Sequence, residues 1–557
     1  MKNTNNSLSK AWRQYEAGKE YKRRIGLYET VRRNERYYRG EQWNGAGQDL
    51  PKPVFNVIRR ITDYFICTVA SDNVGITYSD ENLPYARSSL EAQAIRAGIQ
   101  ALDKNAAYRW ECCRMNYLIY QLLTDAALCG DGILYCYWDA ESESGQPFSG
   151  DIMTTLVDSI NVFPADVNRA DIQSQEYIIL SGRQSVGSLR KEADAHGVPA
   201  DKIAKILPDR EYSLSAGDLG NYELEGDDEG KATYLIKFWR EDGVVCFEKS
   251  TRDCIIHRAK TACRLYPLAY FNWHSTKNSF HGVGPVNMLI PNQNFINRAY
   301  AMAMKHMTDT AFSKIIYDKT KIPEWSNKVG EAVAAVGGGN MADAVSVVGV
   351  GQLQDGYMEL IDRALAVTKE LAGATDSALG NVIPTNTSAI LALQESSRRP
   401  LEQVRANFSH CLEDLAVIWA DMMCAYYPRE RLLPYRDGEQ TRLASVDFSL
   451  LSRALIRAKV EIGSISRYTS SGTQALLDKL LEGGHITALQ YLEQLPEGAL
   501  CNRMELIAQL RASASQKETA SETDADAEKE KEKEKEKENG KPFQKNEVES
   551  EERSLSL

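Results

Sequence analysis

Histidine, cysteine and paired acidic residues are the side chains of this 557-residue chain that could bind a metal or transfer protons. The seven histidines include no HExxH pair, and the eleven cysteines show no paired CxxC spacing, so no zinc site is indicated. His274 and His281 lie seven residues apart near the end of a predicted strand, where we expect structural roles. Asp227 and Asp228 fall in a glycine-bearing loop, where carboxylates are usually solvated.

Phosphate-binding and nucleophile motifs are also missing. The Gly-Lys pairs at Gly18, Gly230 and Gly540 lack the Ser or Thr that must follow in a GxxxxGK[ST] loop. The stretch GVGQLQDG from Gly349 has the wrong spacing for such a loop, and no GxSxG elbow occurs. We therefore predict no catalytic, cofactor-binding or metal-binding residues, no cofactor and no enzyme. The alternative is a DNA-associated enzyme with an unrecognised metal site.

Composition and charge narrow the class further. The net charge is −11, which disfavours a protein that grips nucleic acid through its overall field. No run of eighteen uncharged apolar residues occurs, so no membrane span is predicted. Residues 516–557 carry 9 basic and 14 acidic residues around an EKEKEK run, and we expect residues 514–557 to be a solvated, disordered tail.

Hydrophobic periodicity gives the elements that must position any site. Helices are predicted from about residue 8 to Gly40, after Pro53 and across residues 90–128. Alternating stretches such as GILYCYWD, EYIILSG, TYLIKFWR and VVCFEK predict strands, ending with LYPLAYFNWH near His274. The first half is therefore expected to be mixed α and β.

The second half is predicted to be mainly helical. A helix from Pro285 or Pro291 to about Thr310 precedes a small β-rich patch, and a second helix follows over residues 355–372, with Gly373 at its end. A loop without Lys or Arg leads into a helix over residues 386–426, about 60 Å long, that Pro400 should kink. Its apolar stripe is Leu401, Val404, Phe408, Leu412, Leu415, Trp419 and Met422. Further helices are expected from Leu450 to Ala512.

Several segments, in this order, resemble those of bacteriophage portal proteins, the head–tail connector rings of tailed double-stranded DNA phages. RYYRGEQW with PKPVFNVIRRITDYF resembles the family's opening, and VDSINVFPADVNRADIQSQEYII resembles the middle of its wing. YPLAYFNWHSTKNSFHGVGPVNMLIPNQNFINRAYAM is similar to the entry to its stem, with Gly284, Gln293 and Asn297 at characteristic places. The loop and kinked helix before and after Asn386 look like the tunnel loop and long wing helix.

The resemblance implies an α+β, mainly α portal fold with wing, stem, clip and crown, closed into a ring of usually twelve copies. The implied divisions are a flexible N-terminus (1–10), an α+β wing (11–283), stem helices (284–310 and 355–372), a clip (311–354), a tunnel loop (373–386), a kinked wing helix and return (387–449), a helical crown (450–513) and the charged tail (514–557).

The composition of the implied tunnel loop suits weak contact with a sliding polyanion. A basic wall repeated around a ring would hold the duplex through its phosphates, whereas this loop has Asp376 as its only charge. Contact with double-stranded DNA should therefore be independent of base sequence. An ordinary surface loop remains the alternative. The DNA-facing candidates are Gly373, Ala374, Thr375, Asp376, Ser377, Ala378, Leu379, Gly380 and Asn381.

The implied function is a portal at one capsid vertex for DNA packaging and ejection, which also nucleates procapsid assembly. Implied partners are the terminase large subunit, the major capsid protein and scaffold, and a head–tail adaptor, in the virion and in host cytoplasm during assembly. The clip interface candidates are Lys314, Lys319, Lys321, Trp325 and Lys328, although exposed lysines are usually only solvated. A general DNA-binding scaffold is the third possibility, which the acidic balance disfavours.

Overall fold

The computed structural model divides the chain into two compact units, Met1–Ser464 and Ile465–Leu557, which we describe separately. It describes residues 9–43, 45, 50–70, 74–81, 88–143, 145–209, 230–310, 314–326, 328, 330, 332–337, 340, 343–348, 356–374, 399–429, 431–437, 440–462, 477–494, 506–507 and 509–510. The predicted acidic loop at 215–231 and the predicted charged tail at 514–557 therefore lie almost entirely outside the described residues.

Five helices account for most of the first 130 residues. They are α1 (Lys10–Arg24), α2 (Leu27–Arg39), α3 (Val57–Val69), α4 (Ser89–Cys112) and α5 (Met115–Cys129). The helical regions expected from periodicity are present, but two of them are broken. Gly26 adopts a left-handed φ of 68° between α1 and α2, and Arg114 adopts a φ of 50° between α4 and α5. Such residues interrupt the helical hydrogen-bond ladder, which hydrophobic spacing alone does not reveal.

Two antiparallel sheets follow in the chain. The five-stranded sheet has the order β4-β5-β6-β7-β8, and the three-stranded sheet has the order β3-β2-β9. The strands are β2 (Asp131–Glu143), β3 (Ser149–Val157), β4 (Val162–Pro164), β5 (Tyr177–Ser185), β6 (Lys231–Glu241), β7 (Val244–Ser250), β8 (Ile255–Lys260) and β9 (Leu268–Asn272). β3 and β8 were not predicted, because their polar and small residues dilute the alternation. The short helices α6 (Val186–Ala195) and α7 (Ala200–Ile203) follow β5.

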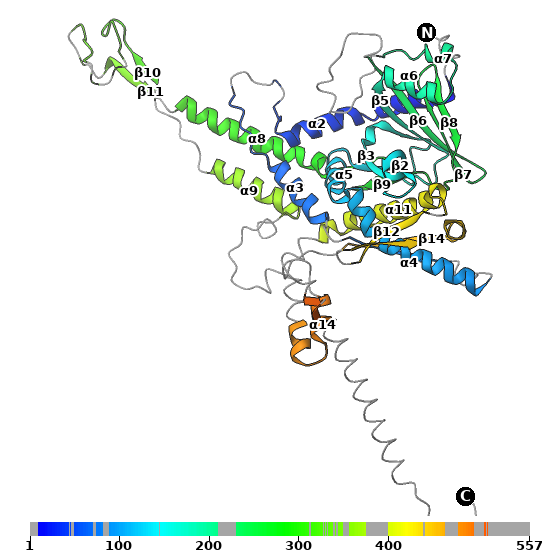
Figure 1. Cartoon of the computed structure of the whole chain (residues 1–557). Coiled ribbons are helices and arrows are strands. Elements are labelled where there is room, and N and C mark those ends of the chain that lie inside the picture. The colour runs from blue at the N-terminus through cyan, green and yellow to red at the C-terminus, as the bar shows by residue number, and fades with distance from the viewer. Residues whose placement is uncertain are drawn as a thin grey trace, which may run out of the picture. The chain divides into compact units, whose positions relative to one another are not determined.

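Two helices with a strand pair between them come next, as the sequence predicts. α8 (Pro285–Thr310) and α9 (Gly356–Leu371) pack against each other, and we call them the helix pair (Figure 1). In the chain between them, β10 (Lys314–Tyr317) pairs antiparallel with β11 (Val345–Val348). Gly373 follows α9 with a φ of 68°, the left-handed conformation expected where a helix ends.

Helix α11 (Glu402–Tyr426) is at the centre of the largest hydrophobic cluster, which we call the α11 core. It packs against β9, β2 and α3. The predicted apolar stripe is confirmed, since every one of its seven side chains from Leu401 to Met422 is at most 4% exposed. Trp419 and Phe408 are fully buried, so this face of the helix contributes a large apolar area to folding.

The expectation that helices recur from residue 450 onward is wrong at its start. After the single turn α12 (Phe448–Leu451), residues Ile456–Ile462 form strand β14, which pairs antiparallel with β1 (Val74–Asp80). The two strands are almost 400 residues apart in sequence, so local periodicity could not reveal their pairing. β14 also packs on α11, and its alternating pattern buries Val460.

The remaining strands are β12 (Leu432–Asp437) and β13 (Gln440–Ser445), which form a two-stranded hairpin against α4. In the second unit, α14 (Ala488–Gln494) is a short helix. Helices contain more residues than strands in the described ranges, and none of the sheets formed there closes on itself. The predicted mixture of helix and strand is therefore confirmed.

A buried charge network ties α4 to the sheet and to α11. The guanidinium of Arg109 donates to Asp151 Oδ1 at 2.7 Å, to the carbonyl of Ile152 at 2.6 Å and to the Tyr427 hydroxyl at 2.5 Å. Tyr427 in turn donates to Asp151 Oδ1 at 2.5 Å. Burial acts to raise the pKa of Asp151, but Arg109 and these hydrogen bonds hold it below its ordinary value.

No helix within the described residues is both long enough and apolar enough to cross a bilayer.

Candidate functional site

The N-terminal half of helix α8 is held in place by a chain of hydrogen-bonded, buried amide side chains. Gln293 Oε1 accepts from the backbone N–H groups of Val57 and Ile58 at 3.0 and 3.3 Å, so this side chain caps the start of α3. Its amide nitrogen donates to the Phe55 carbonyl at 2.7 Å and to Asn297 Oδ1 at 2.9 Å. Gln293 is 1% exposed, and the network therefore replaces water at a helix terminus.

The network continues into the segment after α2. Asn297 donates to Gln42 Oε1 at 2.6 Å, and Gln42 donates to the Tyr37 carbonyl at 3.0 Å. Gln293 and Asn297 were noted in the sequence only through the family resemblance. The structure gives them a physical role, because they connect α8 to α2 and α3. Gln42 lies in the RYYRGEQW stretch that carries part of the resemblance, but it was not singled out there.

Gly284 explains how α8 begins so close to α5. A Cβ atom at this position would lie 2.1 Å from the carbonyl oxygen of Ala127, closer than non-bonded atoms can approach. Only glycine allows the chain to pass α5 at this distance. A side chain here would have to move the first turn of α8.

His281 lies in the segment that leads into α8 and is bound by a buried carboxylate. Its Nδ1 lies 2.6 Å from Asp131 Oδ2, while Asp131 Oδ1 accepts from the N–H of Gly282 at 2.7 Å and the hydroxyl of Tyr270 at 2.8 Å. Burial lowers the pKa of His281, although the bond to Asp131 opposes this shift. The site is a structural anchor, as expected for His281. Asp131 was missed because its partners lie 139 to 151 residues away in the sequence.

His274 does not join a ligand cluster in the structure. Its carbonyl accepts from the N–H of Val283 at 3.0 Å, and burial lowers the pKa of its partly buried ring. Within the described ranges no group of three His, Cys, Asp or Glu side chains is arranged to hold a metal.

The helix pair exposes apolar side chains and is electrically balanced. On α9, Leu360, Val367 and Leu371 are 49%, 41% and 78% exposed and follow helical spacing along one side. On α8, Met288, Phe295 and Met302 recur every seven residues and are also exposed. The two helices carry four basic residues (Arg298, Lys305, Arg363, Lys369) and four acidic residues (Asp309, Glu359, Asp362, Glu370), so their net charge is zero.

Most of the predicted DNA-facing loop lies outside the described residues. Gly373 and Ala374 are described: Gly373 ends α9, and Ala374 is fully buried against the α11 core. Thr375, Asp376, Ser377, Ala378, Leu379, Gly380 and Asn381 are not described. The loop therefore remains a prediction that starts at the position where α9 returns to the α11 core.

Pro400 lies in a short 3₁₀ helix, η5 (Arg399–Leu401), directly before α11. Residues 375–398 are not described, so the predicted long helix before this proline is untested. A 3₁₀ turn at a proline agrees with its missing N–H donor.

The candidates near β10 and β11 lie on a small exposed module. The Trp325 ring stacks on Tyr317, with centroids 5.4 Å apart and planes at 25°. Lys319 and Lys328 are exposed and Lys321 is partly buried; Lys314 belongs to β10, but its side chain is not described. The backbone of Lys321 accepts from the N–H of Val336 at 2.8 Å, which fixes the turn after β10.

Residues 251–446 match the family model described as phage P22-like portal protein. This match supports the prediction that the chain is a phage portal protein. The matched portal region includes β8, β9, the helix pair with β10 and β11, α11, β12 and β13, whereas α2, α3, α5 and Asp131, which contact the start of α8 or His281, precede it.

The match covers a little over a third of the chain, and no curated protein matches. It confirms the resemblance seen in the sequence. Portal proteins are structural components of the phage capsid at its portal vertex, where they act as oligomers rather than as enzymes.

Proposed function

We propose that this chain forms a closed ring of twelve copies that conducts double-stranded DNA during packaging and ejection. The observation that carries the proposal is the helix pair, which lies inside the matched portal region, exposes apolar stripes on both helices and carries no net charge. Exposed apolar stripes of this kind usually pack against another protein surface. A neutral wall attracts the DNA phosphates weakly, and so permits sliding.

In this proposal the helix pair is the stem, β10 and β11 belong to the clip, and residues 373–386 form the tunnel loop. The remaining divisions are those given by the resemblance: wing at 11–283 and 387–449, crown at 450–513. Energy for packaging comes from a separate ATPase, the terminase large subunit. The clip binds this motor and later a head–tail adaptor, while the major capsid protein and scaffold surround the wing during procapsid assembly in the host cytoplasm.

Electron microscopy of the purified full-length protein in negative stain tests ring formation. The proposal expects closed rings with a central hole wide enough for a DNA duplex. A protein that is strictly monomeric under all conditions, including inside virus particles, would refute it. Metal-dependent turnover of nucleotides or DNA by the purified protein would favour an enzyme instead.

The loop and the clip have their own tests within this proposal. Deletion of residues 375–380, which keeps the buried Ala374 in place, should lower the amount of DNA packaged by assembled heads, and unchanged filling would exclude a role for the loop. Exchange of Lys319 and Lys328 for glutamine should weaken binding of the motor or adaptor to preformed rings. The same exchange at Lys277, an exposed lysine outside the clip, is the control.

A further inference from the structure

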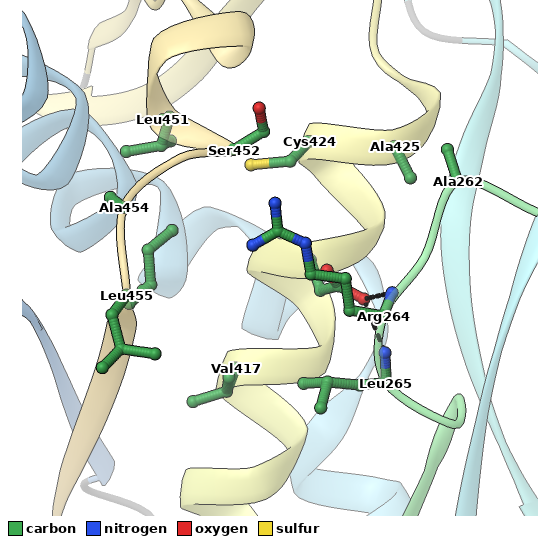
Figure 2. A pocket seen from close by; sticks show the side chains of 12 residues that line it. Ala262, Arg264, Leu265, Val417, Cys424, Ala425, Leu451, Ser452, Ala454 and Leu455 are labelled. Carbon is green, nitrogen blue, oxygen red and sulfur yellow. Dashed lines mark hydrogen bonds between the residues drawn. The ribbon is translucent and has the colours of Figure 1, made fainter. Parts of the chain in front are cut away.

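A pocket of about 360 Å³ opens beside the C-terminal half of α11 (Figure 2). Three segments line it: α11 itself, residues 451–456 that connect α12 to β14, and residues 262–265 that precede β9. Its wall is largely aliphatic, with Val417, Leu451, Leu455 and Ile456 among the lining side chains. Three alanines make part of the remaining wall, which leaves room for a ligand's side chains.

The carboxylate of the pocket is already used by the fold. Asp421 Oδ2 accepts from the backbone N–H groups of Arg264 and Leu265 at 2.8 and 3.0 Å. Burial raises the pKa of Asp421, although these two hydrogen bonds oppose the shift. Ser452 donates to the carbonyl of Ser449 at 2.9 Å. Neither residue offers a free charge to a ligand.

The guanidinium of Arg264 differs from these groups. The side chain is exposed, and Figure 2 shows it extending across the pocket toward Cys424 and Ser452. Its backbone is held by Asp421 and by Arg240, which donates to the Arg264 carbonyl at 3.1 Å. In the described ranges its guanidinium makes no hydrogen bond or ion pair that would hold it. Burial raises the pKa of Asp421 and of Cys424, and the positive charge of Arg264 opposes both shifts. The pocket therefore presents a cationic fork that no hydrogen bond holds within the described ranges, in front of an aliphatic wall.

We propose that this pocket binds an acidic–aliphatic peptide segment of another protein, with an aliphatic side chain on the wall and a carboxylate on Arg264. The planar guanidinium can take a carboxylate through two parallel hydrogen bonds. The aliphatic wall supplies the desolvated contact area that an exposed ion pair lacks. The cavity volume lies near the lower end of the range for ligand sites, which suits a few side chains of a peptide.

Both halves of the pocket are needed to select this ligand. A simple anion would leave the aliphatic wall in water, and an uncharged apolar group would gain nothing from Arg264. The inference goes beyond the proposed function, because a conduit for DNA needs no peptide pocket. The nearby β1–β14 pairing would place the bound peptide next to the last strand of the first unit.

The test measures binding of three capped peptides to the full-length protein by isothermal titration calorimetry. The probe is acetyl-Glu-Leu-Leu-Glu-amide, and its controls are acetyl-Gln-Leu-Leu-Gln-amide and acetyl-Glu-Ser-Ser-Glu-amide. The proposal expects the probe to bind at least tenfold more tightly than either control. Equal binding of the glutamine peptide, or no probe binding at millimolar concentration, would overturn it.

Two variants locate the binding to this pocket. Arg264→Gln keeps the backbone N–H bonds to Asp421 and should weaken probe binding about tenfold without lowering the unfolding temperature. Ala425→Leu, which narrows the pocket from α11, should also weaken binding. Arg60→Gln, at an exposed arginine of α3, should change nothing. Unchanged binding in Arg264→Gln, or binding of dodecanoate in place of the peptide, would refute the proposal.

Discussion

The α11 core and the helix pair differ in how far they bury their apolar side chains and in where they pair their charged side chains. The α11 core buries its apolar stripe completely and pairs its buried charges, as at Arg109 and Asp151. The helix pair leaves Leu371 and Met288 mostly exposed, and its described ion pair Lys305–Asp309 lies at the surface with 3.7 Å between the charged atoms. The core is complete within one chain, whereas the helix pair has apolar surface left for a neighbour. The following variants test this contrast.

The largest effect should come from Arg109→Ala in the α11 core. The change leaves Asp151 buried without its main cation and removes three hydrogen bonds, which should cost about 3–5 kcal/mol of unfolding free energy. Urea denaturation followed by circular dichroism measures it. Arg96→Ala, at an exposed position of the same helix, should change the free energy by less than about 0.5 kcal/mol. Equal unfolding free energies of the two variants would show that the α11 core does not depend on the buried pairing of Arg109 with Asp151.

A smaller effect is expected where the helix pair meets the first helices. Gln293→Ala removes one of the two caps of α3, since Asn56 still accepts from Arg59, and should cost about 1–3 kcal/mol. The N–H of Ile58 loses its Gln293 acceptor, and that of Val57 keeps only the Phe55 carbonyl. Hydrogen exchange at these two amides should become faster. The neighbouring Asn292→Ala serves as the control. If the amides of Val57 and Ile58 exchange at the same rate in both variants, the Gln293 network does not hold α8 against α3.

The carboxyl group of Asp125, on α5, has acidic neighbours in place of a cation. We therefore predict that its contribution to stability depends on pH. Burial, together with Asp158 and Glu35, raises the pKa of Asp125 to about 7. The folded protein therefore holds this proton up to about pH 7, while the unfolded chain releases it near the ordinary value of about 4. Between these values the folded state binds more protons, so the contribution of Asp125 to stability falls as the pH rises.

Asp125→Asn should remove this dependence. The variant should exceed the native protein by about 1–2 kcal/mol at pH 8 and show no gain below about pH 4. Thermal unfolding at both pH values, with the exposed Asp253→Asn as control, measures the difference. A gain that is the same at pH 4 and pH 8 would show that the carboxyl is not shifted in the fold.

The smallest effect on the monomer should come from the exposed stripe of the helix pair. Val367→Glu adds a charge at a 41% exposed position, so its unfolding free energy should change by less than about 0.5 kcal/mol. Ring formation should nevertheless fall sharply, measured by sedimentation velocity. Ala366→Glu, on the adjacent polar face, should assemble normally. If both variants assemble into rings equally well, the exposed stripe is not part of the subunit interface.

The sequence by itself determined the helix pair, the short strands between them and the apolar stripe of α11. These elements follow from local spacing of apolar residues and from Gly373 at a helix end, and the family resemblance was visible in the same segments. The missing catalytic and phosphate-binding motifs led to the prediction that the chain is not an enzyme. Of the nine loop candidates only Gly373 and Ala374 are described, so the DNA-facing loop stays a prediction from the sequence.

Only the tertiary structure decided which polar residues matter for position. Asp131 with His281, Gln42 with Asn297 and Arg109 with Tyr427 meet across 150, 255 and 318 residues, distances at which local patterns carry no information. The same holds for β14, whose partner β1 lies near the other end of the unit. Periodicity reports which face of an element is apolar, but burial decides which distant carboxylate, amide or carbonyl a polar side chain must find.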